Sequence, residues 1–268
     1  MLLHNHLSPI AITIGPLSVR WYGLGFAGAF LFGEWLVKLF LEIENLPKID
    51  TGRIFLFALV FTVVGARLAH CLVYDPSYYL SHPLKILAIW EGGLASHGGV
   101  VGMFAGLGWA TRESPAGTMA VLLDRITIPA AIGGTIVRLG NFANSEILGR
   151  PTSSVLGIVF DAVDQVPRHP VQLYEAVAYF FLAGLLLGVY RWTTARSRPG
   201  LLLGVFLVGV FSVRVLLESF KMPQAAYESE FLVSVGQSLS IPFIALGVLL
   251  VVRAAMRSER SRPISSSI

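Results

Sequence analysis

About seven apolar segments, each near the length that crosses a bilayer, constrain the fold of this chain more than any other feature. They extend over roughly residues 17–41, 54–73, 95–110, 119–142, 171–190, 201–217 and 233–252. A transmembrane helix needs about 20 mostly apolar residues, because that length matches the hydrocarbon core of the membrane. Only 13% of the residues are charged, which leaves little from which to build a soluble domain. The sequence therefore predicts an all-α integral membrane protein, a bundle of about seven transmembrane helices.

The length fits a single polytopic membrane domain, which we expect over residues 1–256. Residues 144–168 contain several Gly and Pro breakers around a strand-like stretch at 155–160, which predicts a small extramembrane element on the outer face. Residues 74–94 are expected to lie along the outer membrane interface, where Tyr and Trp rings favour the headgroup level. Residues 257–268 are rich in Ser and Arg and are expected to form a disordered cytoplasmic tail.

Glycines recur at helical spacing, as in the pairs Gly102/Gly106 and Gly184/Gly188. Lipid offers no hydrophobic drive for helices to associate, so small residues that let backbones approach are the usual solution. These glycines therefore predict close helix packing.

Basic residues are unequally shared between the two sides of the predicted bundle. Ten follow the first, third, fifth and seventh segments: Lys48, Arg53, Arg112, Arg191, Arg196, Arg198, Arg253, Arg257, Arg260 and Arg262. The opposite side has four: Lys85, Arg150, Arg168 and Lys221. The positive-inside bias then predicts a cytoplasmic C-terminus and an N-terminus outside. The pI near 9.4 reflects this asymmetry, and we expect no nucleic-acid partner.

The run from Arg138 to Glu146 places charge and amides at the end of an apolar segment. Inserting Arg into hydrocarbon costs roughly 2.5 to 3.5 kcal/mol, so such a residue usually faces a cavity, a partner or a ligand. Arg138 and Asn141 share a helix face, and Asn144, Glu146 and Gly149 follow where the helix is expected to end. A guanidinium with amides beside it suits a phosphate, while a structural ion pair or a snorkelling Arg is the alternative.

Arg214 and Glu218 are four residues apart in the sixth segment. This spacing suits an intrahelical ion pair that would reduce the cost of inserting either charge. Under the predicted orientation Arg214 and Glu218 lie near the outer face, where Arg138 is also expected. A second hypothesis is therefore that Arg214 and Arg138 bind one anion.

Four further positions carry groups with chemistry or contact potential. His97 is followed directly by Gly98-Gly99, and Gly92-Gly93 lie on its other side, which suits either a substrate-facing proton acceptor or a capping His among packing glycines. Glu175 is explained by the positive end of the helix that opens after Pro170. For Tyr22, a place in the belt of aromatic residues at the membrane interface is a sufficient explanation.

Cys71 lies in an apolar segment and is expected to be an unreactive residue that packs in the protein interior. The sequence contains no His-Glu-x-x-His, Gly-x-Ser-x-Gly or phosphate-loop motif, and no metal ligand is predicted.

Taken together, six motifs resemble those of bacterial prolipoprotein diacylglyceryl transferases. They are Trp21-Tyr22-Gly23, Gly65-Ala66-Arg67, His97-Gly98-Gly99, Arg138-Leu139-Gly140-Asn141-Phe142-Ala143-Asn144-Ser145-Glu146, His169-Pro170-Val171-Gln172-Leu173-Tyr174-Glu175-Ala176 and Gly236-Gln237-Ser238-Leu239-Ser240-Ile241-Pro242. The order of the motifs along the chain is highly specific, whereas any one motif is weak. Two departures are Val137, where Gly often precedes the Arg, and the segment Lys221-Met222-Pro223-Gln224, where an acidic-rich run is more usual.

The resemblance implies transfer of the diacylglyceryl group of phosphatidylglycerol to the lipobox Cys thiol of a preprolipoprotein, with release of glycerol 1-phosphate at the outer face of the inner membrane. It implies catalytic positions at Tyr22, His97, Arg138, Asn141 and Arg214, and substrate-binding positions at Arg138, Asn144, Glu146, Gly149, Arg214 and Glu218. No metal or organic cofactor is required.

The residue chemistry agrees with that reaction. Displacing a phosphomonoester from carbon needs charge stabilisation on the leaving phosphate, which two arginines with amide help would supply. A polytopic carrier of anionic phospholipid that uses the same arginines only for recognition is the alternative. A Mg²⁺-dependent phosphatidyl-transfer enzyme is disfavoured, because the sequence has no acidic cluster to hold the ion.

Overall fold

The computed structural model describes residues 3–15, 17–46, 49–89, 92–93, 95–114, 118–222 and 235–260. The expectations for Lys48, Arg262 and the Trp90–Glu91 pair lie outside the described residues, as does the tail from residue 261. The backbone at Arg257 and Arg260 is helical, so α8 includes the first part of the expected tail.

The elements follow in the order β1 (Leu3–Asn5), β2 (Ile10–Ile14), β3 (Leu17–Arg20), α1 (Trp21–Ile43), α2 (Thr51–Ala69), η1 (His70–Tyr74), α3 (Pro76–Ser81), η2 (Pro83–Leu87), α4 (Ser96–Thr111), α5 (Thr118–Ala143), β4 (Ile158–Phe160), β5 (Pro167–Arg168), α6 (Val171–Trp192), η4 (Ala195–Ser197), α7 (Leu201–Glu218) and α8 (Val235–Arg260). They divide into two compact units: unit 1 comprises Met1–Leu36 and Leu123–Ile268, and unit 2 comprises Val37–Leu122.

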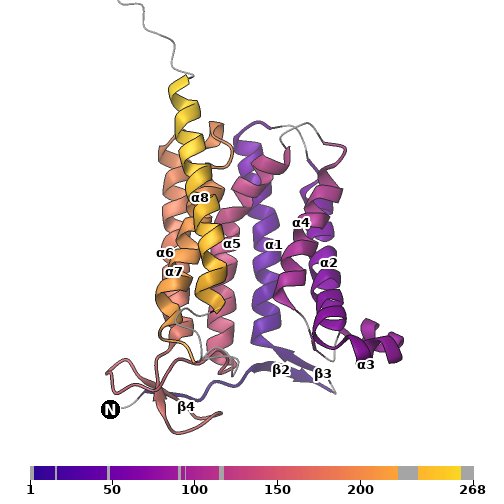
Figure 1. Cartoon of the computed structure of the whole chain (residues 1–268), viewed down its shortest axis with the longest axis vertical. Helices are drawn as coiled ribbons and strands as arrows, with labels where there is room; N and C mark the ends of the chain where they lie inside the picture. Colours follow the sequence, from indigo (N-terminus) through magenta and orange to yellow (C-terminus); the bar gives the residue numbers. More distant parts are fainter. Residues whose placement is uncertain are drawn as a thin grey trace, which may run out of the picture. The chain divides into compact units, whose positions relative to one another are not determined.

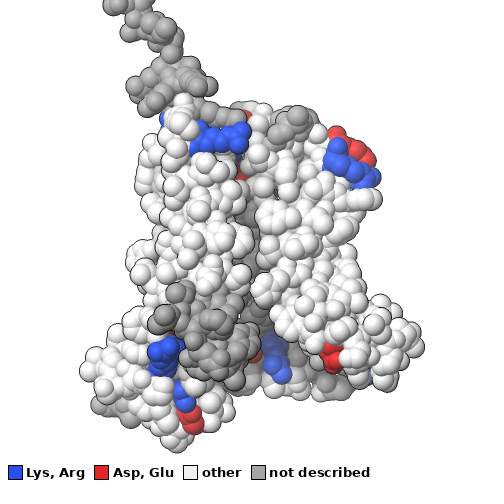
Figure 2. Space-filling view, viewed as in Figure 1, with Lys and Arg blue, Asp and Glu red and all other residues white. Residues whose placement is uncertain are grey.

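The chain is an all-α integral membrane protein with a small extramembrane element. In the described part of the chain, six helices are long and apolar enough to cross a membrane: α1, α2 with η1, α5, α6, α7 and α8. The third predicted segment forms α4, which has 16 residues. The expected number of about seven spans is therefore not confirmed. Figure 2 shows that, on the face drawn, charged side chains gather near the helix ends and almost none lie between them.

The first predicted span begins four residues too early. Leu17–Arg20 forms β3, which pairs antiparallel with β2, and helix α1 starts at Trp21. Ile at every second position of Ile10–Ile14 is a strand pattern, and Gly15 turns the chain between the strands with a φ of 59°. The apolar Leu17 and Val19 therefore belong to a hairpin that precedes the helix.

In unit 1, α6, α7 and α8 lie side by side (Figure 1). The small extramembrane element is built from both ends of the sequence, because β1 pairs in parallel with β4, and β4 pairs antiparallel with β5. The predicted strand at 155–160 is thus present as Ile158–Phe160. The N-terminal strands lie at the end of the helices opposite the last turn of α8 (Figure 1).

A buried Asp closes the other end of unit 1. Asp124 in α5 accepts hydrogen bonds from the backbone amides of Gly200 (2.7 Å) and Leu203 (2.9 Å), so its carboxylate caps the start of α7. The neighbouring Arg125 is buried and donates to the Arg196 carbonyl oxygen (3.1 Å). These two charges within an apolar helix therefore serve structure.

Unit 2 is held by the close approach of α2 and α4. A Cβ atom at Gly102 would meet the carbonyl oxygen of Phe61, and one at Gly98 would meet the backbone of Gly65. The recurrent glycines of α4 thus pack one backbone against another, as predicted. Arg67 is also structural. Its guanidinium donates to the carbonyl oxygens of Ile86 (2.9 Å) and Gly93 (3.1 Å), which fixes the segment that follows α2.

This packing predicts a position-dependent effect of adding one methyl group to α4. Gly102→Ala is expected to destabilise the protein by about 1–3 kcal/mol, because the new methyl overpacks the α2 backbone. Gly108 is the matched control in the same helix, where nothing lies within 4 Å of a new Cβ. Gly108→Ala should be neutral or stabilising by about 0.5–1 kcal/mol. Thermal unfolding in detergent measures both, and equal midpoints for the two variants would contradict the packing argument.

Candidate active site

A buried carboxylate at the start of α6 joins two cations. Glu175 has no exposed surface, and its Oε2 lies 2.8 Å from Nε of Arg138 in α5. Its Oε1 lies 3.0 Å from Nζ of Lys221, just after α7. An isolated buried carboxylate would be costly, and the two cations offset its charge. Glu175 is therefore an ion-pair centre that orients Arg138, a role that its place at a helix start did not predict.

A chain of hydrogen bonds extends from Arg138 to the end of α5. Nη1 of Arg138 donates to Oδ1 of Asn141 (3.2 Å), and Nδ2 of Asn141 donates to Oε2 of Glu146 (2.9 Å). Asn144 donates to the other oxygen of Glu146 (3.2 Å). The structure thus brings together four of the residues that the sequence singled out, and it links them in one network.

The loop that presents Glu146 has an uncommon backbone conformation. Ser145 and Ile147, on either side of it, both have a φ of 54°. A β-branched residue rarely adopts this left-handed region, and such strain persists where the surrounding structure overrides it. Here the amide of Glu146 donates to the Asn141 carbonyl oxygen (2.9 Å), and Gln172 of α6 donates to the Glu146 carbonyl oxygen (2.5 Å). The strained loop therefore holds the Glu146 carboxylate against the two asparagines.

Two amide oxygens in this network are buried without a partner among the described residues: Oδ1 of Asn144 and Oε1 of Gln172. A buried acceptor that lacks a hydrogen bond costs about 1–3 kcal/mol. Unpaired acceptors beside a charged network are therefore suited to hydrogen-bond donors of a ligand, such as hydroxyl groups.

Arg214 is a half-buried cation in α7 that makes no ion pair with any described residue. The alternative of an Arg214–Glu218 pair is not realised, because Glu218 lies 3.4 Å from Nζ of Lys221 instead. Arg214 and Arg138 both interact electrostatically with Tyr179 of α6. Both arginines therefore lie within electrostatic range of Tyr179, and their convergence on one anion stays a prediction.

Two glycines bring the backbone close to this cluster. Gly149 forms an antiparallel bridge with Lys221, and a Cβ atom at Gly149 would meet the carbonyl oxygen of His169. A Cβ atom at Gly236 in α8 would meet the Glu218 carboxylate. Gly149 therefore positions the backbone of Lys221, whose side chain reaches Glu175.

Tyr22 in α1 packs against the helix turn that carries the polar network. A Cβ atom at Gly140 would lie 3.0 Å from Cδ2 of Tyr22, and the tyrosine side chain is exposed on its other side. Tyr22 is thus a partly exposed residue of unit 1 that contacts the helix turn at Gly140.

His97 belongs to unit 2, where it is the second residue of α4. Its side chain is exposed and has no hydrogen bond within the described part of the chain. The adjacent Gly98 and Gly99 are buried against α2, so packing explains these glycines without a ligand. Helix packing therefore explains Gly98 and Gly99, whereas the His97 imidazole is accessible to solvent or a ligand.

Lys221 is the residue of this cluster that sequence reasoning missed. The sequence placed it only among the four basic residues of the predicted outer side and in the departure from an acidic-rich run, yet it is 8% exposed and contacts both Glu175 and Glu218. Its position three residues after Glu218 was a signal for the second contact. The contact with Glu175 had no signal, because 46 residues separate the two positions.

Comparison with known proteins gives one consistent family. The model of the prolipoprotein diacylglyceryl transferase family matches residues 9–253. A phosphatidylglycerol–prolipoprotein diacylglyceryl transferase of Tolumonas auensis is 47% identical over 259 residues, which cover 97% of this chain and 100% of that protein. Proteins of the same name from Chloroherpeton thalassium and Porphyromonas gingivalis are 46% and 40% identical, over 94% and 92% of both chains. The chain belongs to the prolipoprotein diacylglyceryl transferase family.

Proposed function

We propose that this membrane enzyme transfers the diacylglyceryl group of phosphatidylglycerol to a prolipoprotein, and that the acceptor is the thiol of the lipobox Cys. The observation that supports the mechanism is that the half-buried Arg214 has no ion pair among the described residues. It also interacts electrostatically with Tyr179, as Arg138 does. A guanidinium in this situation is suited to an anionic group of a ligand, and the phosphate of phosphatidylglycerol is such a group.

In the proposed mechanism Arg138 and Arg214 bind the phosphodiester and stabilise the charge that develops on the leaving phosphate. Glu175 fixes Arg138 through Nε, at 2.8 Å, and leaves the other edge of the guanidinium directed toward Asn141. Asn141 holds that edge, so the donor is preorganised before the substrate binds. Glu218 and Lys221 complete the charge balance around Glu175.

The glycerol headgroup offers two hydroxyl donors, which distinguish phosphatidylglycerol from lipids with a single amine. We assign these donors to Asn144 and Gln172, whose buried oxygens lack partners among the described residues. Glu146 adds a charged acceptor beside Asn144. A site built to receive hydroxyl groups rejects a lipid that lacks them, because its buried acceptors would stay unpaired.

The reaction forms one bond and breaks one. The acceptor sulfur, as thiolate, attacks the primary carbon that bears the phosphate, and the carbon–oxygen bond breaks. The oxygen leaves with the bonding electron pair as glycerol 1-phosphate. A free thiol is only a few per cent ionised at neutral pH, so a proton acceptor accelerates the step. His97, in unit 2, is the candidate acceptor only by its place in the family motif His97-Gly98-Gly99, and Tyr22 is proposed to help position the substrates. Cys71 has no role in this scheme, because it is fully buried in η1.

We further propose that the protein lies in the bacterial inner membrane with its N-terminus outside and its C-terminus in the cytoplasm. Three of the basic residues assigned to the cytoplasmic side lie around the α6–α7 connection, at Arg191, Arg196 and Arg198. A phosphatase reporter, which folds only outside the cytoplasm, should be inactive when it is fused after Arg262. A green fluorescent protein at the same position should fluoresce. The reverse pattern would place the candidate site on the wrong face for a secreted acceptor.

A product assay separates the transferase from the alternative, a carrier of anionic phospholipid. Purified protein in nanodiscs that contain phosphatidylglycerol is incubated with a lipobox peptide. The transferase predicts that the peptide mass increases by one diacylglyceryl group, and that phosphatidylethanolamine nanodiscs give no product. Unchanged peptide mass, together with movement of intact phosphatidylglycerol between the leaflets of liposomes, would favour the carrier.

A further inference from the structure

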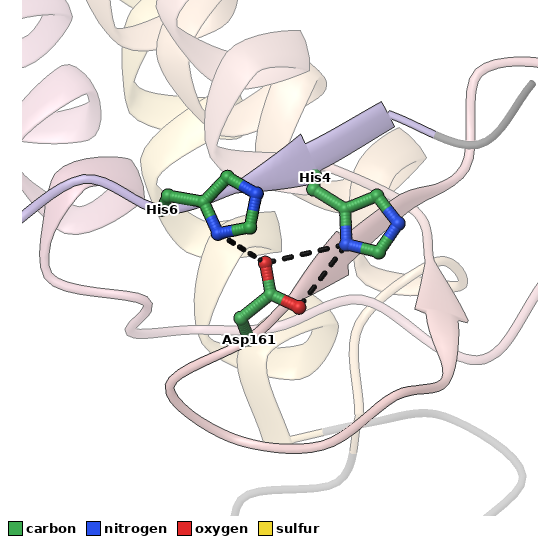
Figure 3. A group of neighbouring side chains, drawn as sticks. All are labelled: His4, His6 and Asp161. Carbon is green, nitrogen blue, oxygen red and sulfur yellow. Dashed lines mark hydrogen bonds and ion pairs between the residues drawn. The ribbon is translucent and has the colours of Figure 1, made fainter.

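Two histidines and one aspartate from opposite parts of the chain meet in the extramembrane element of unit 1 (Figure 3). Nδ1 of His4 lies 3.1 Å from Oδ1 of Asp161, and Nδ1 of His6 lies 2.8 Å from Oδ2 of the same residue. The two imidazole rings are parallel, with an interplanar angle of 8° and centroids 5.5 Å apart. The three side chains thus offer two imidazole nitrogens and a carboxylate oxygen that all lie within 4.8 Å of one another.

The strands explain why these side chains meet. His4 and His6 are two residues apart, so in extended backbone both point to the same side of the chain. The parallel register pairs His4 with Val159 and Asn5 with Phe160, which brings Asp161 alongside at the end of β4. The arrangement is thus fixed by backbone pairing rather than by the three side chains alone.

From this geometry we propose that His4, His6 and Asp161 form a binding site for a divalent transition-metal ion, for which Zn²⁺ is the probe. Zn²⁺ binds imidazole nitrogen and carboxylate oxygen at about 2.0–2.2 Å, so two ligand atoms on one tetrahedral ion lie about 3.3 Å apart. The observed separations of 2.8 and 3.1 Å need little change to admit the ion. The donor set favours Zn²⁺, Cu²⁺ or Ni²⁺ over Mg²⁺ and Ca²⁺, which prefer oxygen ligands.

The three side chains also suit a cation by their chemistry, because a metal ion is bound by an ionised carboxylate and by neutral imidazoles. An ion bound there would replace the present contacts between the two imidazoles and the Asp161 carboxylate.

The site would act as a clip on the N-terminal strand. Asn5, between the two histidines, points to the opposite side and donates to the Phe142 carbonyl oxygen (2.8 Å) at the end of α5. Phe142 also contacts the ring of Phe160 in β4 (5.7 Å between centroids). A metal ion that joins β1 to Asp161 would thus stabilise the strand that holds the last turn of α5, which carries Asn141 and is followed directly by Asn144.

The test uses the full chain in nanodiscs, with an affinity tag that contains no histidine and with metal removed by a chelator. Isothermal titration with Zn²⁺ should show one equivalent bound, and Zn²⁺ should raise the thermal unfolding midpoint. His4→Ala combined with His6→Ala should abolish both effects. Asp161→Asn keeps a hydrogen-bond acceptor for the histidines and should weaken binding by at least about tenfold, since even the loss of an outer partner costs 10- to 100-fold. His82→Ala, at an exposed histidine of unit 2, is the control and should bind like the wild type.

Absence of stoichiometric Zn²⁺ binding by the wild-type protein would overturn the proposal and leave a His–Asp ion pair only. Equal binding by the wild type and the double His variant would do the same. Transferase activity is a separate readout, because none of the three side chains belongs to the proposed reaction.

Discussion

Replacement of Arg214 by lysine is expected to lower the rate of glycerol phosphate release by about 10²–10³-fold, the usual cost of removing one directed donor to a developing charge. Lysine keeps a point charge but loses the planar fork that matches two phosphate oxygens. Arg138→Lys should lose at least as much, because lysine cannot contact Glu175 and Asn141 as Nε and Nη1 now do. The rates are measured in nanodiscs with saturating phosphatidylglycerol.

Arg253→Lys is the matched control for both variants. Arg253 is an exposed residue of α8 and is assigned no role in the reaction, so its rate should equal that of the wild type. A thermal unfolding midpoint for each variant separates loss of chemistry from loss of fold. Near-normal rates for both Arg138→Lys and Arg214→Lys would contradict the paired-arginine mechanism and leave the arginines as structural groups.

Glu175→Gln should have the second largest effect, on stability as well as on activity. The substitution keeps the shape of the side chain but leaves Arg138 and Lys221 without their shared counter-charge. Breaking a buried ion pair by removing one partner costs about 3–5 kcal/mol. Both the unfolding midpoint and the rate should therefore fall.

A second substitution distinguishes the two losses. Adding Lys221→Met to Glu175→Gln restores the charge balance of the cluster, because Arg138 and Glu218 then remain as one cation and one anion, so the double variant should recover part of the stability. Its activity should stay low, because Arg138 has still lost the carboxylate that orients it. Glu113→Gln, at an exposed residue beside Arg112, is the control and should change neither quantity. Wild-type stability of Glu175→Gln would refute the role of Glu175 as the centre of the cluster.

Most of the membrane-spanning helices could be predicted from the sequence, because a helix in lipid needs a long apolar segment, and each such segment is visible in the sequence without knowledge of its contacts. The start of the first segment was wrong, because Leu17 and Val19 extend the apolar stretch but pair with β2 in a hairpin. The segment predicted at 95–110 is present as α4, and only its count as a seventh span is not confirmed.

The polar site was only partly predictable. Four of the site residues lie within nine positions of the sequence: Arg138, Asn141, Asn144 and Glu146. The end of one helix therefore brings them together, and this does not depend on the tertiary fold. Glu175 forms ion pairs with Arg138 and Lys221, which are 37 and 46 residues away in the sequence. These pairs could not be predicted, because each charged residue had an explanation within its own segment. His4 and Asp161 are separated by 157 residues, and only the pairing of β1 with β4 brings them within 3.1 Å.

The central claim is that diacylglyceryl transfer from phosphatidylglycerol is coupled to a thiol acceptor through the Arg138–Arg214 site. The most direct measurement follows labelled glycerol phosphate released from phosphatidylglycerol with a lipobox peptide that contains either Cys or Ser. We predict one glycerol phosphate per lipidated Cys peptide, no release above background with the Ser peptide, and release about 10²–10³-fold slower with Arg214→Lys. Equal release with the Cys and Ser peptides would show hydrolysis without an acceptor and would contradict the claim.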